Sequence, residues 1–237
     1  MNILELSEQE IGRRESLETL RQMGINPYPA DEFPVNAWSD DIREQFIDIP
    51  TEKDEEGNDI PGKATAENSR NVTIAGRMMG QRIMGKAAFA ELQDSKGRVQ
   101  VYVQRDEICP DENKDLYNIV FKKLLDIGDF IGVKGYVFRT KTGEISVHAK
   151  EIVLLSKSLK PLPIVKYKDG IAYDKFDDPE LRYRQRYVDL VVNDGVKDTF
   201  LKRATIVRTM RNILDGSGYT EVDTPILQNI AGGASAR

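Results

Sequence analysis

Apolar residues recur at two different spacings along this chain, and the spacing predicts where helices and strands lie. Near the N-terminus one stripe has a helical period: Leu17, Leu20 and Met23. Ser7 and Glu10 have capping-box spacing, so we expect a helix that begins there and ends at Gly24. A second, shorter helix is expected from Ser39, and residues 51–68 are expected to form a polar loop.

The middle of the chain alternates apolar and polar residues, which is typical of strands with one buried face. Five strands are predicted, one opened by Val72 and Ile74 and the others at residues 87–93, 98–105, 130–138 and 144–155. Residues 94–97 have the composition of a hairpin turn, and residues 111–125 have a helical period. This order predicts an OB-fold, a five-stranded barrel that binds oligonucleotides on one face.

Alternation also separates residues that face the barrel interior from those that face outward. In the second strand Ala88, Ala90 and Leu92 oppose Phe89, Glu91 and Gln93. Phe89 thus shares its face with a carboxylate and an amide, and an exposed ring on such a barrel can stack a base. The alternative is a phenylalanine covered by a loop. The same alternation predicts two further outward sets: Gln100, Tyr102 and Gln104 in the third strand, and Glu144, Ser146 and His148 in the fifth.

The C-terminal quarter returns to a helical period. Five apolar residues follow it: Phe200, Ala204, Val207, Met210 and Leu214. Gly216 and Gly218 are expected to end this helix, and residues 219–224 have strand character before Pro225. One helix and one strand are too few for an independent α/β domain, so this part is expected to be incomplete alone. We predict four regions: residues 1–69, an N-terminal helical extension with an acidic loop; 70–157, the barrel; 158–180, a linker; and 181–237, the incomplete part.

Charge is distributed unevenly, which matters more than the net charge of −5. Residues 31–67 hold 12 acidic and 3 basic side chains, whereas residues 77–105 hold 6 basic and 2 acidic ones. A local basic stretch can meet a phosphate backbone even on an acidic protein, although such a stretch is more often a solvated face.

The single cysteine, Cys109, excludes a disulfide scaffold, and no Cys/His spacing indicates a metal site. No apolar run reaches membrane length, so we expect a soluble cytoplasmic protein.

Several blocks of sequence together resemble bacterial class II lysyl-tRNA synthetases, from Arg13 to Arg237. The blocks lie at residues 75–94, 97–106, 139–152, 181–190 and 218–237. The last block resembles motif 1 of class II synthetases and includes Pro225, which the resemblance places at a homodimer interface. The resemblance implies that residues 181–237 begin a class II α/β domain built on an antiparallel sheet, with the motif 1 helix and strand.

The resemblance implies the activity of the parent enzyme, which uses ATP and Mg²⁺ to join lysine to tRNA. The family's ATP-binding arginines of motifs 2 and 3, and its acidic residues for metal and lysine, lie beyond Arg237. We therefore expect no catalytic residue and no metal ligand in this chain, no bound cofactor, and no lysine activation by the chain alone. For the whole enzyme the resemblance implies a homodimer that binds tRNA.

The resemblance also implies roles for individual residues in reading a U-rich anticodon. Phe89 is expected to stack a base, Arg82 and Gln100 to contact the central uracil or a nearby phosphate, and Glu144 to accept from a base N–H. Arg82 is expected in the loop after the first strand. Arg13, Arg14 and Arg21 on the first helix are expected to contact the tRNA backbone. Gly232, Gly233 and Ala234 resemble the loop beside the amino-acid pocket.

Two other functions are compatible with parts of the sequence. One is a stand-alone OB-fold protein that binds nucleic acid, but such a protein needs neither the motif 1 block nor residues 181–190. The other is an aspartyl- or asparaginyl-type synthetase, which shares the same plan. Residues 77–89 and 232–237 resemble the lysyl type more than the aspartyl type.

Overall fold

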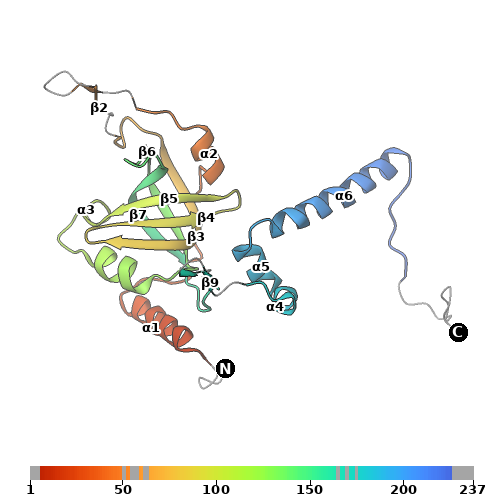
Figure 1. The fold of residues 1–237 in the computed structure, drawn as a ribbon, viewed down its shortest axis with the longest axis horizontal. Coiled ribbons are helices and arrows are strands. Elements are labelled where there is room, and N and C mark those ends of the chain that lie inside the picture. Colours follow the sequence, from red (N-terminus) through yellow and green to blue (C-terminus); the bar gives the residue numbers. More distant parts are fainter. Residues whose placement is uncertain are drawn as a thin grey trace. The chain divides into compact units, whose positions relative to one another are not determined.

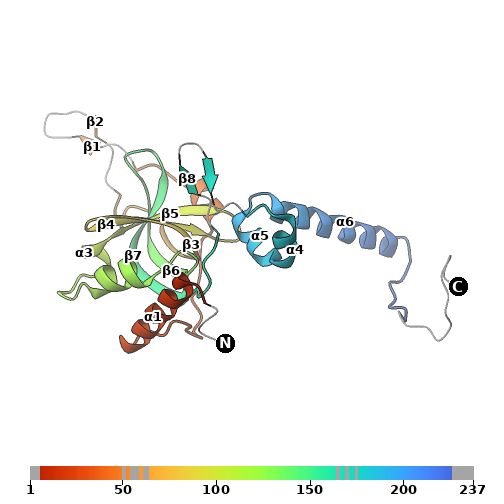
Figure 2. The same ribbon diagram turned by 60° about the horizontal axis from the view of Figure 1, so that its bottom comes forward.

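The computed structural model describes residues 6–49, 52–53, 59–60, 64–163, 166–168, 171–173 and 176–225. Figures 1 and 2 show the chain in two views. It divides into two compact units, Met1–Leu162 and Pro163–Arg237.

The first unit is built around a closed five-stranded barrel (Figure 1). Its strands are β3 (Asn71–Met84), β4 (Ala87–Gln93), β5 (Arg98–Gln104), β6 (Phe130–Arg139) and β7 (Ile145–Ser156). The order around the barrel is β3-β4-β5-β7-β6, with β6 also paired to β3; β5 and β7 run parallel and the other pairs antiparallel. The expected OB-fold is confirmed.

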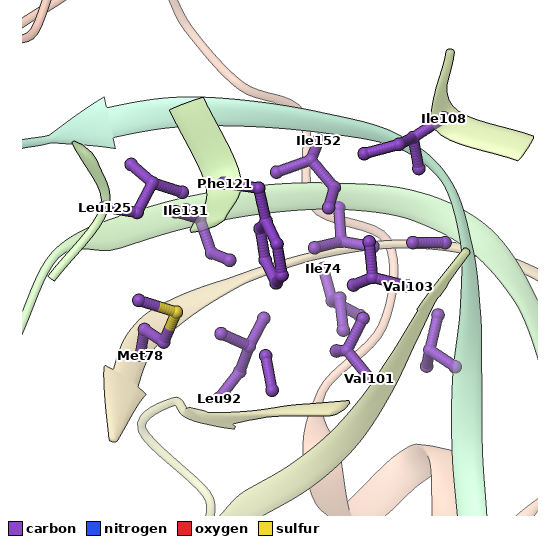
Figure 3. Close-up of a cluster of buried hydrophobic side chains, with 14 of the residues drawn as sticks. Ile74, Met78, Leu92, Val101, Val103, Ile108, Phe121, Leu125, Ile131 and Ile152 are labelled. Carbon is purple, nitrogen blue, oxygen red and sulfur yellow. The ribbon is translucent and has the colours of Figure 1, made fainter. Parts of the chain in front are cut away.

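The barrel interior is filled by side chains that alternate strictly along the strands. In β4 and β5 every second residue is buried, and these residues carry the small and branched side chains that alternation predicted. Between β5 and β6 lie α3 (Arg105–Ile108) and a π-helix, η2 (Leu116–Leu124). Phe121 of η2 is 1% exposed and lies among Leu92, Val101 and Ile131 in the core (Figure 3). Burying such a set removes apolar surface from water, which stabilises the barrel.

The N-terminal extension consists of two helices. The first, α1 (Glu8–Gln22), begins with the predicted capping box of Ser7 and Glu10 and packs against η2. The second, α2 (Ser39–Glu44), is tied to the turn between β4 and β5, because the backbone N–H and the hydroxyl of Ser39 each donate to Asp94 over 2.7 Å. The expected polar loop contains a short antiparallel pair, β1 (Glu52–Lys53) and β2 (Asp59–Ile60).

One expectation about the barrel is wrong: Arg82 does not lie in a loop. β3 continues to Met84, and Arg82 pairs with Phe89 of β4. The connection to β4 is only Gly85 and Lys86, and Gly85 has a φ of 64°. The end of β3 pairs with β4 alone and its side chains are exposed, so no buried face imposes alternation there.

The second unit is mainly helical in its described residues. It contains α4 (Pro179–Arg184), α5 (Arg186–Val192) and α6 (Val196–Gly216), of which α6 is the helix predicted from the apolar period. Two short strands, β8 (Lys166–Lys168) and β9 (Ile171–Tyr173), pair within the region expected to be a linker. The strand expected at residues 219–224 is not formed, since a strand needs a neighbour to bond with.

At Gly135 the backbones of β6 and β7 lie very close together, and a substitution there tests their pairing. A Cβ atom at Gly135 would lie 2.0 Å from the backbone oxygen of His148 on the neighbouring strand. Gly135→Ala is therefore expected to lower the free energy of unfolding by about 3 kcal/mol, because backbone atoms must move apart. Guanidinium unfolding monitored by circular dichroism measures this difference.

Gly12→Ala provides the matched control, because a Cβ there meets no atom within 4 Å and Gly12 lies inside α1. This variant should raise the free energy of unfolding by roughly 0.5–1 kcal/mol through helix propensity. Equal stability of the wild type and the Gly135 variant would contradict the strand pairing described here.

Candidate nucleic-acid interface

A line of side chains crosses the outer face of the barrel. The strand register places one residue from each strand side by side: Arg82 of β3, Phe89 of β4, Tyr102 of β5, His148 of β7 and Tyr136 of β6. Phe89, Tyr102 and His148 are half-buried, while Ala88, Val101 and Val147 beside them in the sequence point into the core. The ring of Phe89 thus lies outside the barrel, as alternation predicted. We call this line, together with Phe138, the aromatic row.

The rings of the aromatic row contact one another. The centroids of Phe89 and Tyr102 are 5.1 Å apart, and those of Tyr102 and His148 are 5.0 Å apart. Tyr136 lies 4.8 Å from His148, and Phe138 lies 5.9 Å from Tyr102. These tilted and edge-on contacts are geometries that aromatic pairs prefer. The neighbours therefore restrict how the Phe89 ring can turn, which suits a fixed stacking surface.

Arg82 lies at the open end of the aromatic row. Its guanidinium carbon is 5.4 Å from the centroid of the Phe89 ring, within the range of a cation–π contact, and the residue is exposed. An exposed cation beside a half-buried ring can meet either a base edge or a phosphate.

A polar row runs beside the aromatic row. Glu91 pairs with Gln100, and Gln100 pairs with Ser146. The hydroxyl of Ser146 donates to Oε1 of Gln100 over 3.0 Å, which holds the amide so that its nitrogen remains the donor. Arg98 donates to Glu91 over 3.3 Å.

Glu144 lies in the hairpin between β6 and β7, two residues before Ser146, and is exposed. The hairpin is closed by backbone bonds from Thr140 N–H to Glu144 O and from Gly143 N–H to Thr140 O, both 2.9 Å long. Gly143 has a φ of 91°, which favours glycine. The backbone of Glu144 thus lies next to the polar row, since its carbonyl oxygen is 3.5 Å from the hydroxyl of Ser146.

Sequence reasoning proposed four residues for this face and missed most of the aromatic row. The structure brings Arg82, Phe89 and Gln100 onto one surface, with Glu144 in the adjoining hairpin. The residues that were not proposed are Tyr102, Tyr136, Phe138 and His148. A signal existed for Tyr102, because the turn at residues 94–97 sets the register that brings it opposite Phe89.

Arg13, which was expected to contact a nucleic-acid backbone, makes its contacts within the protein in this structure. Arg13 is 8% exposed, and its guanidinium donates to the carbonyl of Ile127 over 2.8 Å. It also donates to the carbonyls of Ser158 and Lys160, over 3.1 and 3.2 Å. Arg13 lies on the same helix face as Leu20, which packs into the core. The guanidinium of Arg13 therefore joins α1 to the barrel.

The carbonyls that Arg13 binds flank a buried ionic node. The Asp129 carboxylate accepts from Lys157 Nζ over 2.9 Å and from the N–H groups of Ser158 and Asp126 over 2.7 and 2.8 Å. Burial raises the pKa of Asp129, although Lys157 favours its charged form. The node is fully buried and is therefore structural.

Arg14 and Arg21 are placed differently from Arg13 on the same helix. Arg14 is half-buried and donates to the carbonyl of Glu10 over 2.9 Å. Arg21 is exposed and lies 3.5 Å from Glu18. Contact of these two residues with a nucleic-acid backbone stays a prediction.

The remaining proposed residues lie at the C-terminal end. Gly232, Gly233 and Ala234 are outside the described residues, and Pro225 is described and exposed. Across the described ranges no group of three or more His, Cys, Asp or Glu side chains could hold a metal ion. In that same part of the chain, every helix is too short or too polar to cross a membrane.

Comparison with known families matches both units. Residues 72–155 match the family described as OB-fold nucleic acid binding domain. Residues 178–237 match the family described as tRNA synthetases class II (D, K and N). The second match is not expected of a stand-alone OB-fold protein.

Individual relatives are similar along the whole chain. Lysine–tRNA ligase of Porphyromonas gingivalis strain W83 is 59% identical over 237 residues, which are 100% of this chain and 38% of that protein. The ligase of Azobacteroides pseudotrichonymphae is 59% identical over 98% of this chain and 43% of its own length. The ligase of Christiangramia forsetii is 54% identical over 98% and 38% respectively. The chain thus spans about two fifths of the length of these relatives.

The contrast between Arg13 and Arg21 can be tested by unfolding. Arg13→Ala is expected to lower the free energy of unfolding by about 1–3 kcal/mol, because it leaves buried carbonyls without a donor. Arg21→Ala, on the exposed side of α1, should change it by less than about 0.5 kcal/mol. Urea unfolding of both variants checks this; an equal loss in the two would contradict the placement of Arg13.

Proposed function

Because this chain is a homologue of the lysine–tRNA ligases along its whole length, we propose that it carries the anticodon-reading part of such a ligase. The whole enzyme would join lysine to tRNA in an ATP-dependent reaction in the cytoplasm. The observation that supports this most is the aromatic row on the outer face of an OB barrel, with a polar row beside it. Single-stranded RNA loops are commonly recognised by stacking bases on rings and bonding their edges.

The aromatic row and the polar row together offer the contacts that a uracil base needs. The Phe89 ring would stack the base, and the Gln100 amide, held by Ser146, would donate to a carbonyl oxygen of the base. Glu144 would accept from the ring N–H of uracil. Cytosine has no N–H at that ring position, so the same arrangement discriminates between the two pyrimidines. Arg82 would contact either this base edge or the adjoining phosphate.

Arg14 and Arg21 would add contacts to the RNA backbone from α1. Such contacts carry no sequence information and make affinity depend on salt. Arg13 has no part in this proposal, because its guanidinium is occupied by backbone carbonyls.

The second unit would contribute the dimer interface of the whole ligase. No residue of α6 is buried, and five large apolar side chains of this helix are more than half exposed: Leu201, Ile206, Met210, Ile213 and Leu214. A second copy covering this face, together with Pro225, would remove that apolar area from water. Gly232, Gly233 and Ala234 would approach the lysine substrate in the complete pocket.

Catalysis is proposed to need more than these 237 residues. The whole enzyme would use ATP and Mg²⁺, and the described residues do not fit a metal site. We therefore derive no catalytic step for them.

The stacking role of Phe89 predicts a loss of RNA affinity. Phe89→Ala should weaken binding of an anticodon stem-loop with a UUU anticodon by about 1–3 kcal/mol, without unfolding the barrel. Fluorescence anisotropy with a labelled stem-loop measures the difference, and circular dichroism checks the fold. A stem-loop with a GUC anticodon should bind the wild type more weakly than UUU.

Phe130→Ala is the matched control for this experiment. Phe130 is also a partly exposed phenylalanine on a barrel strand, but its ring lies beneath Arg77 and outside the aromatic row. Its loss should leave affinity nearly unchanged. Unchanged affinity in the Phe89 variant, or equal losses in both variants, would remove the support for stacking.

The 237 residues alone are expected to show no lysine-dependent exchange of pyrophosphate into ATP. The reason is that they span about two fifths of the ligases they resemble. Incubation with lysine, ATP, Mg²⁺ and labelled pyrophosphate tests this, with a full-length relative as the positive control. Exchange that requires lysine would show that this portion is sufficient for activation.

A further inference from the structure

The hairpin that carries Glu144 is held by a residue from outside the barrel. Arg139, at the end of β6, donates through Nε and Nη2 to both carboxylate oxygens of Asp48, over 2.8 and 3.1 Å. Asp48 belongs to the segment that follows α2, 91 positions earlier in the chain. Two parallel bonds between a guanidinium and a carboxylate fix direction as well as distance.

The same guanidinium also binds the hairpin itself. Its Nη1 donates to the carbonyl of Gly143 over 3.0 Å. Gly143 directly precedes Glu144, so the held carbonyl lies in the peptide unit that begins Glu144. Arg139 therefore joins Asp48 on one side to the backbone of Glu144 on the other, and we call these contacts the Asp48–Arg139 clamp.

A third contact sets the plane of the guanidinium. Its carbon lies 4.8 Å from the centroid of the Phe46 ring, two residues before Asp48. Arginine stacks on aromatic faces while its edge remains free to donate, which lysine cannot reproduce. The segment after α2 thus supplies both a surface for the guanidinium and the carboxylate that orients it.

Beneath this segment lies a hollow of about 720 Å³. Its walls come from the segment, from residues 68–70 and from β6, and include Ile42, Phe46, Ile47, Ile49, Arg70 and Val137. Ile47 is 85% exposed, so it adds little packing. Phe46 packs against the hydrophobic core, and the clamp adds a polar link from this segment to the hairpin.

We propose that Asp48 and Arg139 are positioning residues for base discrimination, which act by fixing the backbone of Glu144. This inference rests on the proposed function, in which Glu144 accepts from a base N–H. A carboxylate on an unrestrained hairpin could still bind RNA, but it would distinguish uracil from cytosine less well. The N-terminal extension would thereby contribute to specificity without touching the base.

The clamp is too exposed to matter much for folding. The side chains of Arg139 and Asp48 are 42% and 67% exposed, and exposed ion pairs stabilise proteins only slightly. The hydrogen bond from Arg139 lowers the pKa of Asp48. Variants of the clamp are therefore expected to fold, and their effect is expected in discrimination.

The test measures the ratio of affinities for two stem-loops that differ only in uridine or cytidine at the middle of the anticodon. Glu144→Gln should lower this ratio about tenfold, as expected for loss of a charged hydrogen bond. Asp48→Asn and Arg139→Lys should each lower it roughly threefold, the second despite keeping its charge. Adding Asp48→Asn to Glu144→Gln should cause no further loss, because both changes act through the same carboxylate.

Glu151→Gln is the matched control, since Glu151 forms an exposed ion pair of 2.9 Å with Lys134 and lies outside the hairpin that carries Glu144. It should leave the ratio unchanged. Unfolding midpoints of all variants should agree with the wild type.

Three outcomes would overturn the inference or its basis. If Glu144→Gln lowers the ratio and the clamp variants do not, the clamp has no positioning role while the proposed function stands. If Asp48→Asn weakens both stem-loops equally, the residue acts on general affinity, and the inference is wrong. If neither Glu144→Gln nor Phe89→Ala affects RNA binding, the proposed function fails and the inference fails with it.

Discussion

The candidate interface depends on the pairing register of β4 with β5. That register places Phe89 opposite Tyr102, and a slip of one residue would exchange the inward and outward faces of a strand. Such a slip is disfavoured from inside, because Ala88, Leu92 and Val101 are buried in the observed register and would turn outward. The packing that stabilises the barrel therefore also determines which rings lie on its outer face. The parallel pairing of β5 with β7 extends the row to His148.

Much of this arrangement could be predicted from the sequence, since burial imposes a period on both strands and helices. The boundaries of β4, the helix α6 and the capping box of α1 followed from such patterns. Prediction failed where no core-facing pattern exists. Arg82 lies in a strand end with exposed neighbours, and residues 219–224 have strand composition but no paired strand. The cross-strand contacts of Tyr136 and Phe138 required the register of β6 with β7, which includes an irregularity at Gly135.

The distribution of charged residues predicted the site less well than the period of apolar residues predicted the fold. Arg13 and Arg21 lie on the same helix, yet one is buried among carbonyls and the other is exposed. Of the basic residues between 77 and 105, Arg77 donates to the carbonyl of Gly128 and Lys96 pairs with Asp40, so these contacts are internal. Arg82 is exposed beside the Phe89 ring, which is why we propose it for contact with a ligand. A basic stretch becomes informative only when the structure shows which of its cations already have partners.

The central claim, that the outer ring of β4 stacks an anticodon base, can be tested most directly by photocrosslinking. A stem-loop with 5-iodouridine in the middle of its anticodon would be bound to the chain, irradiated and digested with trypsin. We expect the crosslinked nucleotide on the peptide of residues 87–96, which contains Phe89, or on the neighbouring peptide of residues 99–105, which contains Tyr102. Crosslinks confined to α1, α2 or the second unit would contradict this account of recognition.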